Sequence, residues 1–241
     1  MNKKNGIRTF TKIMMTSLLA GVSSAAQAQP VAEETDPGEI IVTATKRAEN
    51  LQSIPISVSA ITGDTLSKSR VTQADELVTK IPNLQLTSTV GDNTPIFALR
   101  GVSMSDYSLN QASPVATYYD EVYKGNFAFL GIALFDLERV EVLRGPQGTL
   151  YGKNTTGGAV NLISRAPKLG DANGYLNLGY GNYNRIDANG AVNLPLGDKA
   201  ALRIAGTLSK ADGWFKNVLP GKPDLASVSE YGVRASLLFE P

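Results

Sequence analysis

The pattern of apolar and polar positions divides this chain of 241 residues into three stretches. Residues 13–22 form an apolar run behind a basic N-terminus, and residues 46–169 hold short apolar segments separated by glycine and proline. Residues 174–241 alternate between apolar and polar side chains. Because helices, buried strands and half-buried strands repeat with different periods, each stretch predicts a different kind of structure.

The C-terminal stretch predicts four antiparallel strands, each with one apolar and one polar face. Each segment has about the length of a tilted membrane strand. A soluble antiparallel sheet with one wet face would give the same alternation, so the pattern alone leaves both structures open. Short turns and one long loop with Trp214 separate the segments, which are 176–181, 185–194, 202–209 and 230–239.

The middle stretch predicts an α+β unit that is large enough for its own core. Glycine on both sides of short apolar strands indicates sharp turns and close backbone packing. This pattern is clearest between the strands predicted at 139–144 and 159–164, where the turn and loop residues are Gly145, Pro146, Gly148, Gly152, Gly157 and Gly158. Further strands are predicted at 54–60, 84–87, 96–100 and 115–120.

Two helices are predicted in the same unit. The first covers 64–69, and the second begins near Thr72, which can cap it with Asp75 three residues later. Leu77 and Ile81 would share one face of the second helix, and Pro82 would end it.

The N-terminus predicts a cleaved export signal. A basic head is followed by an apolar run of about ten residues and by small residues that end in Ala26-Gln27-Ala28. The run is too short for a membrane-spanning helix, although a buried or interfacial helix is an alternative. We expect cleavage after Ala28, a mature chain that begins at Gln29, and a flexible acidic segment before residue 39.

Composition excludes several classes of function. The chain has no histidine and no cysteine, which removes the commonest general base, the commonest metal ligand and any disulfide framework. Lys and Arg number 23 and Asp and Glu 22, so nucleic acid is not an expected partner. Asp120 and Glu121 would point to opposite faces of a strand. No catalytic constellation, metal site or cofactor is therefore predicted.

Residues 39–44 form a short β-branched segment next to the flexible tail. Such a segment favours an extended chain and can add itself to the edge of another protein's sheet. An ordinary first strand of the domain is the alternative. The residues are Glu39, Ile40, Ile41, Val42, Thr43 and Ala44.

Several motifs, in order, resemble TonB-dependent outer-membrane receptors. LRGPQGTLYG at 143–152 and GGAVNLIS at 157–164 resemble the end of the plug domain of this family, and TQADELVTKIPNLQL, FALRGV and VATYYDEVYKG resemble earlier parts of it. EIIVTA at 39–44 resembles the TonB box, which these receptors offer to the periplasmic energy-coupling protein TonB. The matching plug residues are Arg100, Gly101, Arg144, Gly145, Pro146, Gly148, Tyr151, Gly152, Gly157, Gly158 and Asn161.

The resemblance implies a fold class and an arrangement of domains. It implies an α+β plug domain followed by the first antiparallel strands of a transmembrane β-barrel, with about 22 strands in the family and four here. The expected parts are a signal peptide (1–28), a segment with the TonB box (29–45), the plug (46–169) and the first barrel strands (170–241). The expected location is the bacterial outer membrane, with lipid around the strands and the plug facing the periplasm.

The resemblance also implies roles for single residues. Plug arginines at the positions of Arg100 and Arg144 pair with carboxylates of the barrel wall, which would lie mostly in strands that this chain lacks. The ligand would bind from outside to plug apices, where the candidate contacts are Asn93, Tyr107, Asn110, Gln111, Asn126 and Phe127. These residues contain no cluster of metal ligands, so a metal cargo would arrive already chelated, with a ferric siderophore as the first expectation.

Two other classes of function stay open at this stage. A periplasmic plug-like module could bind a ligand without transport, and an inactive truncated receptor would share the same motifs; a secreted β-rich enzyme is a more distant alternative. A reading frame that continues into further alternating strands would favour the transporter.

Overall fold

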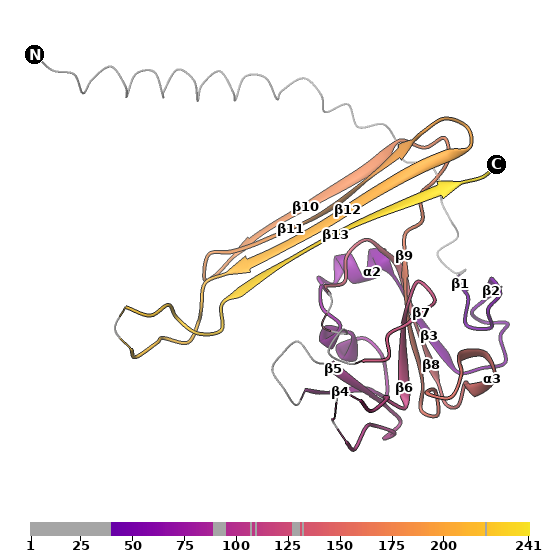
Figure 1. Ribbon diagram of the computed structural model, residues 1–241, viewed down its shortest axis with the longest axis horizontal. Helices are drawn as coiled ribbons and strands as arrows, with labels where there is room; N and C mark the ends of the chain where they lie inside the picture. Colours follow the sequence, from indigo (N-terminus) through magenta and orange to yellow (C-terminus); the bar gives the residue numbers. More distant parts are fainter. Residues whose placement is uncertain are drawn as a thin grey trace, which may run out of the picture. The chain divides into compact units, whose positions relative to one another are not determined.

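A computed structural model describes residues 40–88, 95–106, 108, 110–126, 131, 133–219 and 221–241. The predicted signal peptide and the tail up to Glu39 lie outside these residues. A mixed α+β domain comes first in the chain and a four-stranded antiparallel sheet follows it (Figure 1). Among the described residues, no helix is long and apolar enough to cross a membrane.

A five-stranded sheet forms the centre of the first domain, with the strand order β3-β8-β9-β6-β7. Its β6 and β9 pair in parallel, and the other neighbours are antiparallel. The outer strand β7 is only two residues long. The strands are β3 (Val58–Thr62), β6 (Val115–Tyr119), β7 (Val122–Tyr123), β8 (Leu137–Arg144) and β9 (Gly158–Ser164).

Both faces of this sheet are buried, so β6 and β9 are mostly apolar. Its central strand β8 instead alternates apolar residues with charged ones that have partners within the domain, such as Glu141. Val140, Val142 and Val160 point into one core, together with side chains of α2 (Gly63–Lys68), the 3-10 helix η1 (Asp75–Thr79), β4 (Leu84–Ser88) and β5 (Pro95–Leu99). The other face packs against the N-terminal segment, which contains β1 (Ile41–Val42) and β2 (Glu49–Asn50), and against α3 (Gly148–Tyr151).

The predicted strands are found with small corrections at their ends. The strand predicted at 54–60 begins only at Val58, because Pro55 cannot donate to a ladder and the first contact is the Arg144 N–H to the Ser57 carbonyl at 2.9 Å. The strands predicted to reach Arg100 and Asp120 end one residue earlier, since both residues have positive φ, 52° and 46°. Glu121 also has positive φ, 67°, so Asp120 and Glu121 occupy a turn and not the strand that the sequence predicted.

The helical predictions were right in place and partly wrong in detail. Helix α2 covers Gly63–Lys68, one residue earlier than predicted, and the Thr65 N–H donates to the capping hydroxyl of Thr62 at 3.3 Å. The second helix is a 3-10 turn, and Thr72 does not cap it. Instead the Glu76 carboxylate accepts the N–H groups of Thr72, at 2.6 Å, and of Gln73, at 3.1 Å.

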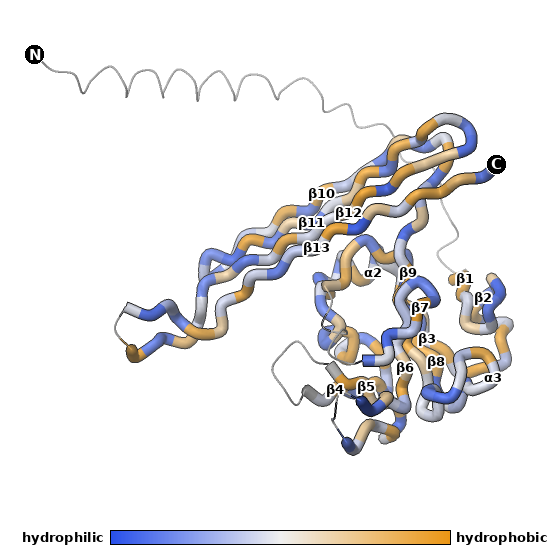
Figure 2. Tube along the Cα trace, viewed as in Figure 1, coloured by the Kyte–Doolittle hydropathy of each residue, from blue (hydrophilic) through white to orange (hydrophobic). Residues whose placement is uncertain are grey.

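The four C-terminal strands form a meander in the order β10-β11-β12-β13, as the alternation predicted. Figure 2 shows the alternation of apolar and polar residues along each of them. Their apolar side chains are exposed: Leu176 is 69 % exposed and Val233 78 %. The opposite, polar face contains buried residues, among them Asn193 at 0 % and Arg203 at 6 %. The strands are β10 (Asn173–Gly181), β11 (Arg185–Pro195), β12 (Ala200–Ala211) and β13 (Val228–Phe239).

Candidate functional site

The glycine motif between β8 and β9 forms a closed loop that returns the chain to the same sheet. The Gly145 N–H donates to the Gly157 carbonyl at 3.0 Å, and the Gln147 N–H donates to that of Thr155 at 2.9 Å. Gly158 has φ 145°, and a Cβ atom there would lie 2.2 Å from the Leu143 carbonyl oxygen. A side chain cannot fit at this position, so the loop geometry depends on glycine. The short helix α3 inside the loop was not predicted.

Tyr151 and Asn161 of the same motif are buried and form a polar group under the N-terminal segment. The Asn161 side-chain amide donates to the Tyr151 hydroxyl at 2.9 Å, and the Tyr118 hydroxyl donates to the Tyr151 carbonyl. Burial is the main reason why the pKa of Tyr151 rises from 10.0 to about 12. The Lys46 ammonium lies over the Tyr151 ring, 4.6 Å from its centroid, in a cation–π contact.

The segment at residues 40–44, which we call the box segment, is docked on this part of the domain. Val42 and Ala44 are fully buried, whereas Ile41 is 43 % exposed. One edge of β1 pairs with β2. On the other side the Thr43 N–H donates to Glu141 Oε1 at 2.7 Å. The Glu141 carboxylate thus accepts the hydrogen bond of the Thr43 N–H, a main-chain donor that an incoming strand would need.

Glu141 is itself buried and is held by Arg139. The Arg139 Nε donates to Glu141 Oε1 at 2.7 Å, and its Nη2 donates to the Thr43 hydroxyl at 3.2 Å. Glu138, which is half-exposed, also pairs with Arg139. Buried carboxylates of this kind need such partners, because an unpaired buried charge is costly. Sequence reasoning did not find this contact, since it joins residues 98 positions apart.

Arg100 and Arg144 lie beside each other, as their shared partner shows. Both guanidinium groups donate to the Ser57 hydroxyl, at 3.2 Å from Arg100 and 3.4 Å from Arg144. Arg144 also donates to Ser59 and to the Pro82 carbonyl. Burial, and then the positive charge of Arg100, lowers the pKa of Arg144. Within the part of the chain that the structure describes, neither arginine forms an ion pair with a carboxylate.

The predicted ligand contacts can be placed only in part. Asn93, Tyr107 and Phe127 lie outside the described residues. Asn110 and Gln111 are exposed in the segment between β5 and β6, and the half-buried Asn126 follows β7. Their role in binding therefore stays a prediction. Across the described positions, no three His, Cys, Asp or Glu side chains gather in a way that could hold a metal ion.

A buried ion cluster joins the domain to the polar face of the C-terminal sheet, and we call it the anchor cluster. At its centre Asp136, with a side chain 0 % exposed, accepts Arg203 of β12 at 2.8 Å and Arg234 of β13 at 3.2 Å. Arg234 also donates to the Asp136 carbonyl at 2.8 Å and stacks over the Phe135 ring at 5.0 Å. The Tyr175 hydroxyl of β10 lies 3.4 Å from Asp136 Oδ1.

Sequence reasoning missed the anchor cluster, although the sequence contains a signal for it. Arg203 and Arg234 stand at polar positions of the alternating segments, where an arginine on an inward face needs a carboxylate partner. The expected pairs had plug arginines and wall carboxylates, whereas this cluster has a plug carboxylate and wall arginines. The partner Asp136 lies in a short segment before β8 and has a positive φ of 50°.

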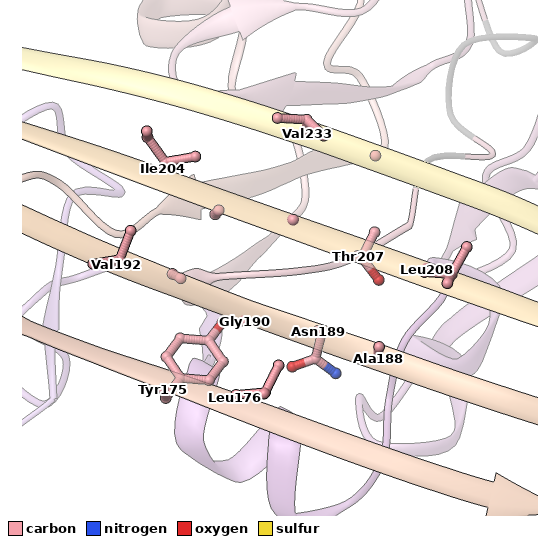
Figure 3. Close-up of a pocket in the computed structure, with 14 residues that line it drawn as sticks. Tyr175, Leu176, Ala188, Asn189, Gly190, Val192, Ile204, Thr207, Leu208 and Val233 are labelled. Carbon is pink, nitrogen blue, oxygen red and sulfur yellow. The ribbon is translucent and has the colours of Figure 1, made fainter. Parts of the chain in front are cut away.

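The apolar face of the sheet has a shallow hollow of about 480 Å³. Gly190 and Gly206 lie opposite each other in adjacent strands and leave space between larger apolar side chains, among them Leu176, Val192 and Ile204 (Figure 3). No charged side chain lines the hollow, and its few polar lining residues include Asn189 and Thr207.

An α+β domain that is fastened to the buried polar face of a sheet with an apolar outer face defines a plug and part of the wall of a barrel receptor. The comparisons with known proteins agree. Residues 50–159 match the family model described as TonB-dependent Receptor Plug Domain. The chain belongs to the TonB-dependent receptors, which confirms the resemblance and the fold class predicted from the sequence.

Known relatives are receptors of this family. The chain is 30 % identical over 221 residues to the Pesticin receptor of Yersinia pestis, covering 91 % of this chain and 32 % of that protein. It is 32 % identical over 225 residues to the Ferrioxamine B receptor of Salmonella typhimurium strain SL1344, covering 86 % and 30 %. The chain thus spans about a third of the length of these relatives.

A solved structure shows the same fold. The crystal structure of the ferric yersiniabactin uptake receptor FyuA from Yersinia pestis matches with a TM-score of 0.62 and 29 % identity. The match covers 75 % of this chain and 29 % of that one.

Proposed function

We propose that this chain is the N-terminal part of a TonB-dependent transporter that carries a ferric siderophore across the bacterial outer membrane. The observation that carries the proposal is the attachment of a plug domain to the polar face of a sheet whose other face is apolar and exposed. In a complete barrel, lipid would cover the apolar face and the plug would occlude the lumen.

The names of the relatives support the choice of cargo. One is described as a receptor for ferrioxamine B and another as an uptake receptor for ferric yersiniabactin. For this chain the ferric siderophore is a proposal by analogy, and the exposed Asn110 and Gln111 remain candidate contacts. A chelated metal needs no protein ligands of its own, which suits a plug of this composition.

The box segment would couple transport to energy. In its docked state one edge of β1 pairs with β2, and the Thr43 N–H is bound to Glu141. TonB would add a strand to this segment through main-chain hydrogen bonds, so the segment must first leave the plug. Force on the released segment would then rearrange the plug and admit the ligand. Export through a signal peptide cleaved after Ala28 is part of the same proposal.

The test is a proline in the box segment of the complete receptor. Ile41 suits it better than Val42, because Ile41 is 43 % exposed and its replacement leaves the buried side chains in place. Ile41→Pro removes a main-chain donor, so we expect uptake of radiolabelled ferric siderophore to fall to background while surface binding is unchanged. Ile41→Ala, which keeps the N–H, is the matched control and should transport. Normal uptake by Ile41→Pro would refute the assignment of the box.

A further inference from the structure

The anchor cluster differs from the box segment in what is left behind when each contact is broken. If the box segment leaves, Glu141 keeps its bond to Arg139, because both residues belong to β8. If Asp136 leaves the sheet, one buried carboxylate and two nearly buried guanidinium groups lose their partners at once. As long as the rest of the plug covers the site, these charges stay away from water, and unpaired buried charges are costly. Asp136 can therefore leave only when the surrounding interface between plug and sheet also opens.

Other contacts between plug and sheet support the anchor cluster. The Gln73 side-chain amide donates to the Glu230 carboxylate of β13 at 3.1 Å. Asn193 of β11 accepts the Lys168 N–H at 2.9 Å and donates to the Lys168 carbonyl at 2.8 Å. A Cβ atom on Gly232 would lie 3.0 Å from the Phe135 ring, so the plug packs closely on β13 at this place.

The opposite end of β8 has a different character. Arg144 lies eight residues after Asp136, which corresponds to roughly 26 Å along an extended strand. Near Arg144 the described partners are serine hydroxyls, a backbone carbonyl and a second arginine. Just before β8, Asp136 is thus held by ion pairs with the sheet. At the other end of β8, Arg144 has no carboxylate partner among the described residues.

We propose that the anchor cluster is a permanent attachment, so that during transport the part of the plug around Asp136 stays on β12 and β13 while other parts of the plug move. Asp136 is then a positioning residue, and Arg203 and Arg234 are its fixed counterparts. The proposal rests on the proposed function, because it concerns which part of a transporter moves.

Covalent staples test the proposal directly. These 241 residues contain no cysteine, so introduced pairs are the only thiols in this part of the complete receptor. Any cysteine in the remainder is first replaced by serine, and the pair is then joined with a short bifunctional thiol reagent. Gln73→Cys with Glu230→Cys staples the plug to β13 where their side chains meet at 3.1 Å. We expect uptake of ferric siderophore by the stapled receptor to equal that of the same variant before stapling.

A staple at the box segment is the matched control. Thr43→Cys with Glu141→Cys joins side chains that lie 3.2 Å apart, and we expect this staple to abolish uptake. If the Gln73–Glu230 staple also stops uptake while surface binding persists, the plug leaves β13 during transport and the proposal is overturned. If the complete receptor without any substitution takes up no ferric siderophore, the proposed function fails instead.

A second measurement isolates the role of Asp136 and does not need uptake. Asp136→Asn keeps the shape but removes the charge, so we expect the plug to loosen and the outer membrane to admit a bulky antibiotic such as vancomycin. The Gln73–Glu230 staple should reverse this leak if Asp136 acts as an anchor. A leak that the staple does not reverse would show a role in folding only and would overturn the proposal.

The control for charge removal is Asp187→Asn. Asp187 is bound by Arg185 at 2.7 Å and by Ser209 at 2.7 Å within the sheet, so it does not hold the plug. We expect no leak in this variant. An equal leak in Asp187→Asn and Asp136→Asn would contradict the proposal.

Discussion

The plug buries its apolar side chains, whereas the four-stranded sheet exposes them. In the plug Val140, Val142 and Val160 are 0 % exposed, because both faces of the central sheet are covered by other parts of the chain. In the C-terminal sheet Tyr231 is 85 % exposed and Val233 78 %. The same residue types are thus a core in one region and an outer surface in the other.

The difference resolves an ambiguity that alternation alone leaves open. A soluble sheet with one wet face buries its apolar side and exposes its polar side. Here the arrangement is inverted, since Asn193 and Arg203 on the polar face are buried against the plug and the apolar face is open. Such an inverted sheet is the arrangement expected for a wall between lipid and a protein-filled lumen.

The largest expected effect separates the two regions physically. Residues 29–168 alone should be soluble, because their apolar positions cover one another. Residues 29–241 should aggregate without detergent, because the added strands expose an apolar face and unpaired edges. Sedimentation and circular dichroism on both polypeptides measure this. A monomeric, cooperatively folded 29–241 in plain buffer would mean that the strands belong to a soluble sheet.

The second prediction concerns the two arginines whose carboxylate partners are expected in the rest of the barrel. In the complete receptor Arg144→Met should lower the unfolding free energy by about 3–5 kcal/mol, because it orphans a buried carboxylate of the wall. In residues 29–241 in detergent the same change should cost only about 1 kcal/mol, the value of one part-buried hydrogen bond, because the other two bonds of Arg144 are exposed. Denaturant unfolding of both proteins gives the comparison. Equal losses in the two would show that the chain itself provides all the partners of Arg144.

Sequence reasoning predicted the fold well where local chemistry decides the structure. The strands before and after the glycine loop, the four alternating segments and the end of the second helix near Pro82 follow from residue types within a few positions of each other. The N-terminal limit of β3 was misplaced, because alternation from Ile54 outweighed Pro55, which cannot join a ladder. The turn at Asp120 and Glu121 was read as strand for a similar reason, since positive φ at non-glycine residues leaves little trace in the sequence.

The contacts of the candidate sites could not be predicted in the same way. Thr43 and Glu141 are 98 residues apart, and Asp136 and Arg203 are 67 apart. Nothing in the local pattern connects such pairs, because they meet only after the sheets have formed. Charge at an inward position of an alternating strand predicts that a partner exists, but it does not say which residue that is.

The third prediction distinguishes the two faces of the sheet. Val233→Arg places a charge on the exposed apolar face and should destabilise the complete receptor in lipid by about 2–4 kcal/mol if that face meets the centre of the bilayer. Asn177→Arg, at an exposed position on the polar face of β10, is the control and should cost less. Unfolding by urea in lipid vesicles measures both. A larger loss for Asn177→Arg would mean that the faces have been assigned the wrong way round.

The smallest effect concerns the plug alone and appears only in alkaline solution. Tyr151 has a pKa raised from 10.0 to about 12 in the folded state, chiefly by burial. Below pH 10 the phenol is protonated in both states, so the shift has no effect on stability there. As the pH rises from 10 to about 12, the unfolded chain loses this proton while the folded chain keeps it, so stability falls, by up to about 2–3 kcal/mol.

Tyr151→Phe in residues 29–168 should lack this loss, although it should be about 1 kcal/mol less stable at neutral pH because Asn161 loses its hydrogen bond to the hydroxyl. Comparing the two proteins cancels the other tyrosines, so urea unfolding at pH 8 and at pH 11 should show the difference between them shrinking or reversing. A constant difference would mean that the Tyr151 hydroxyl is open to solvent, and that the polar group beneath the box segment is looser than the structure shows.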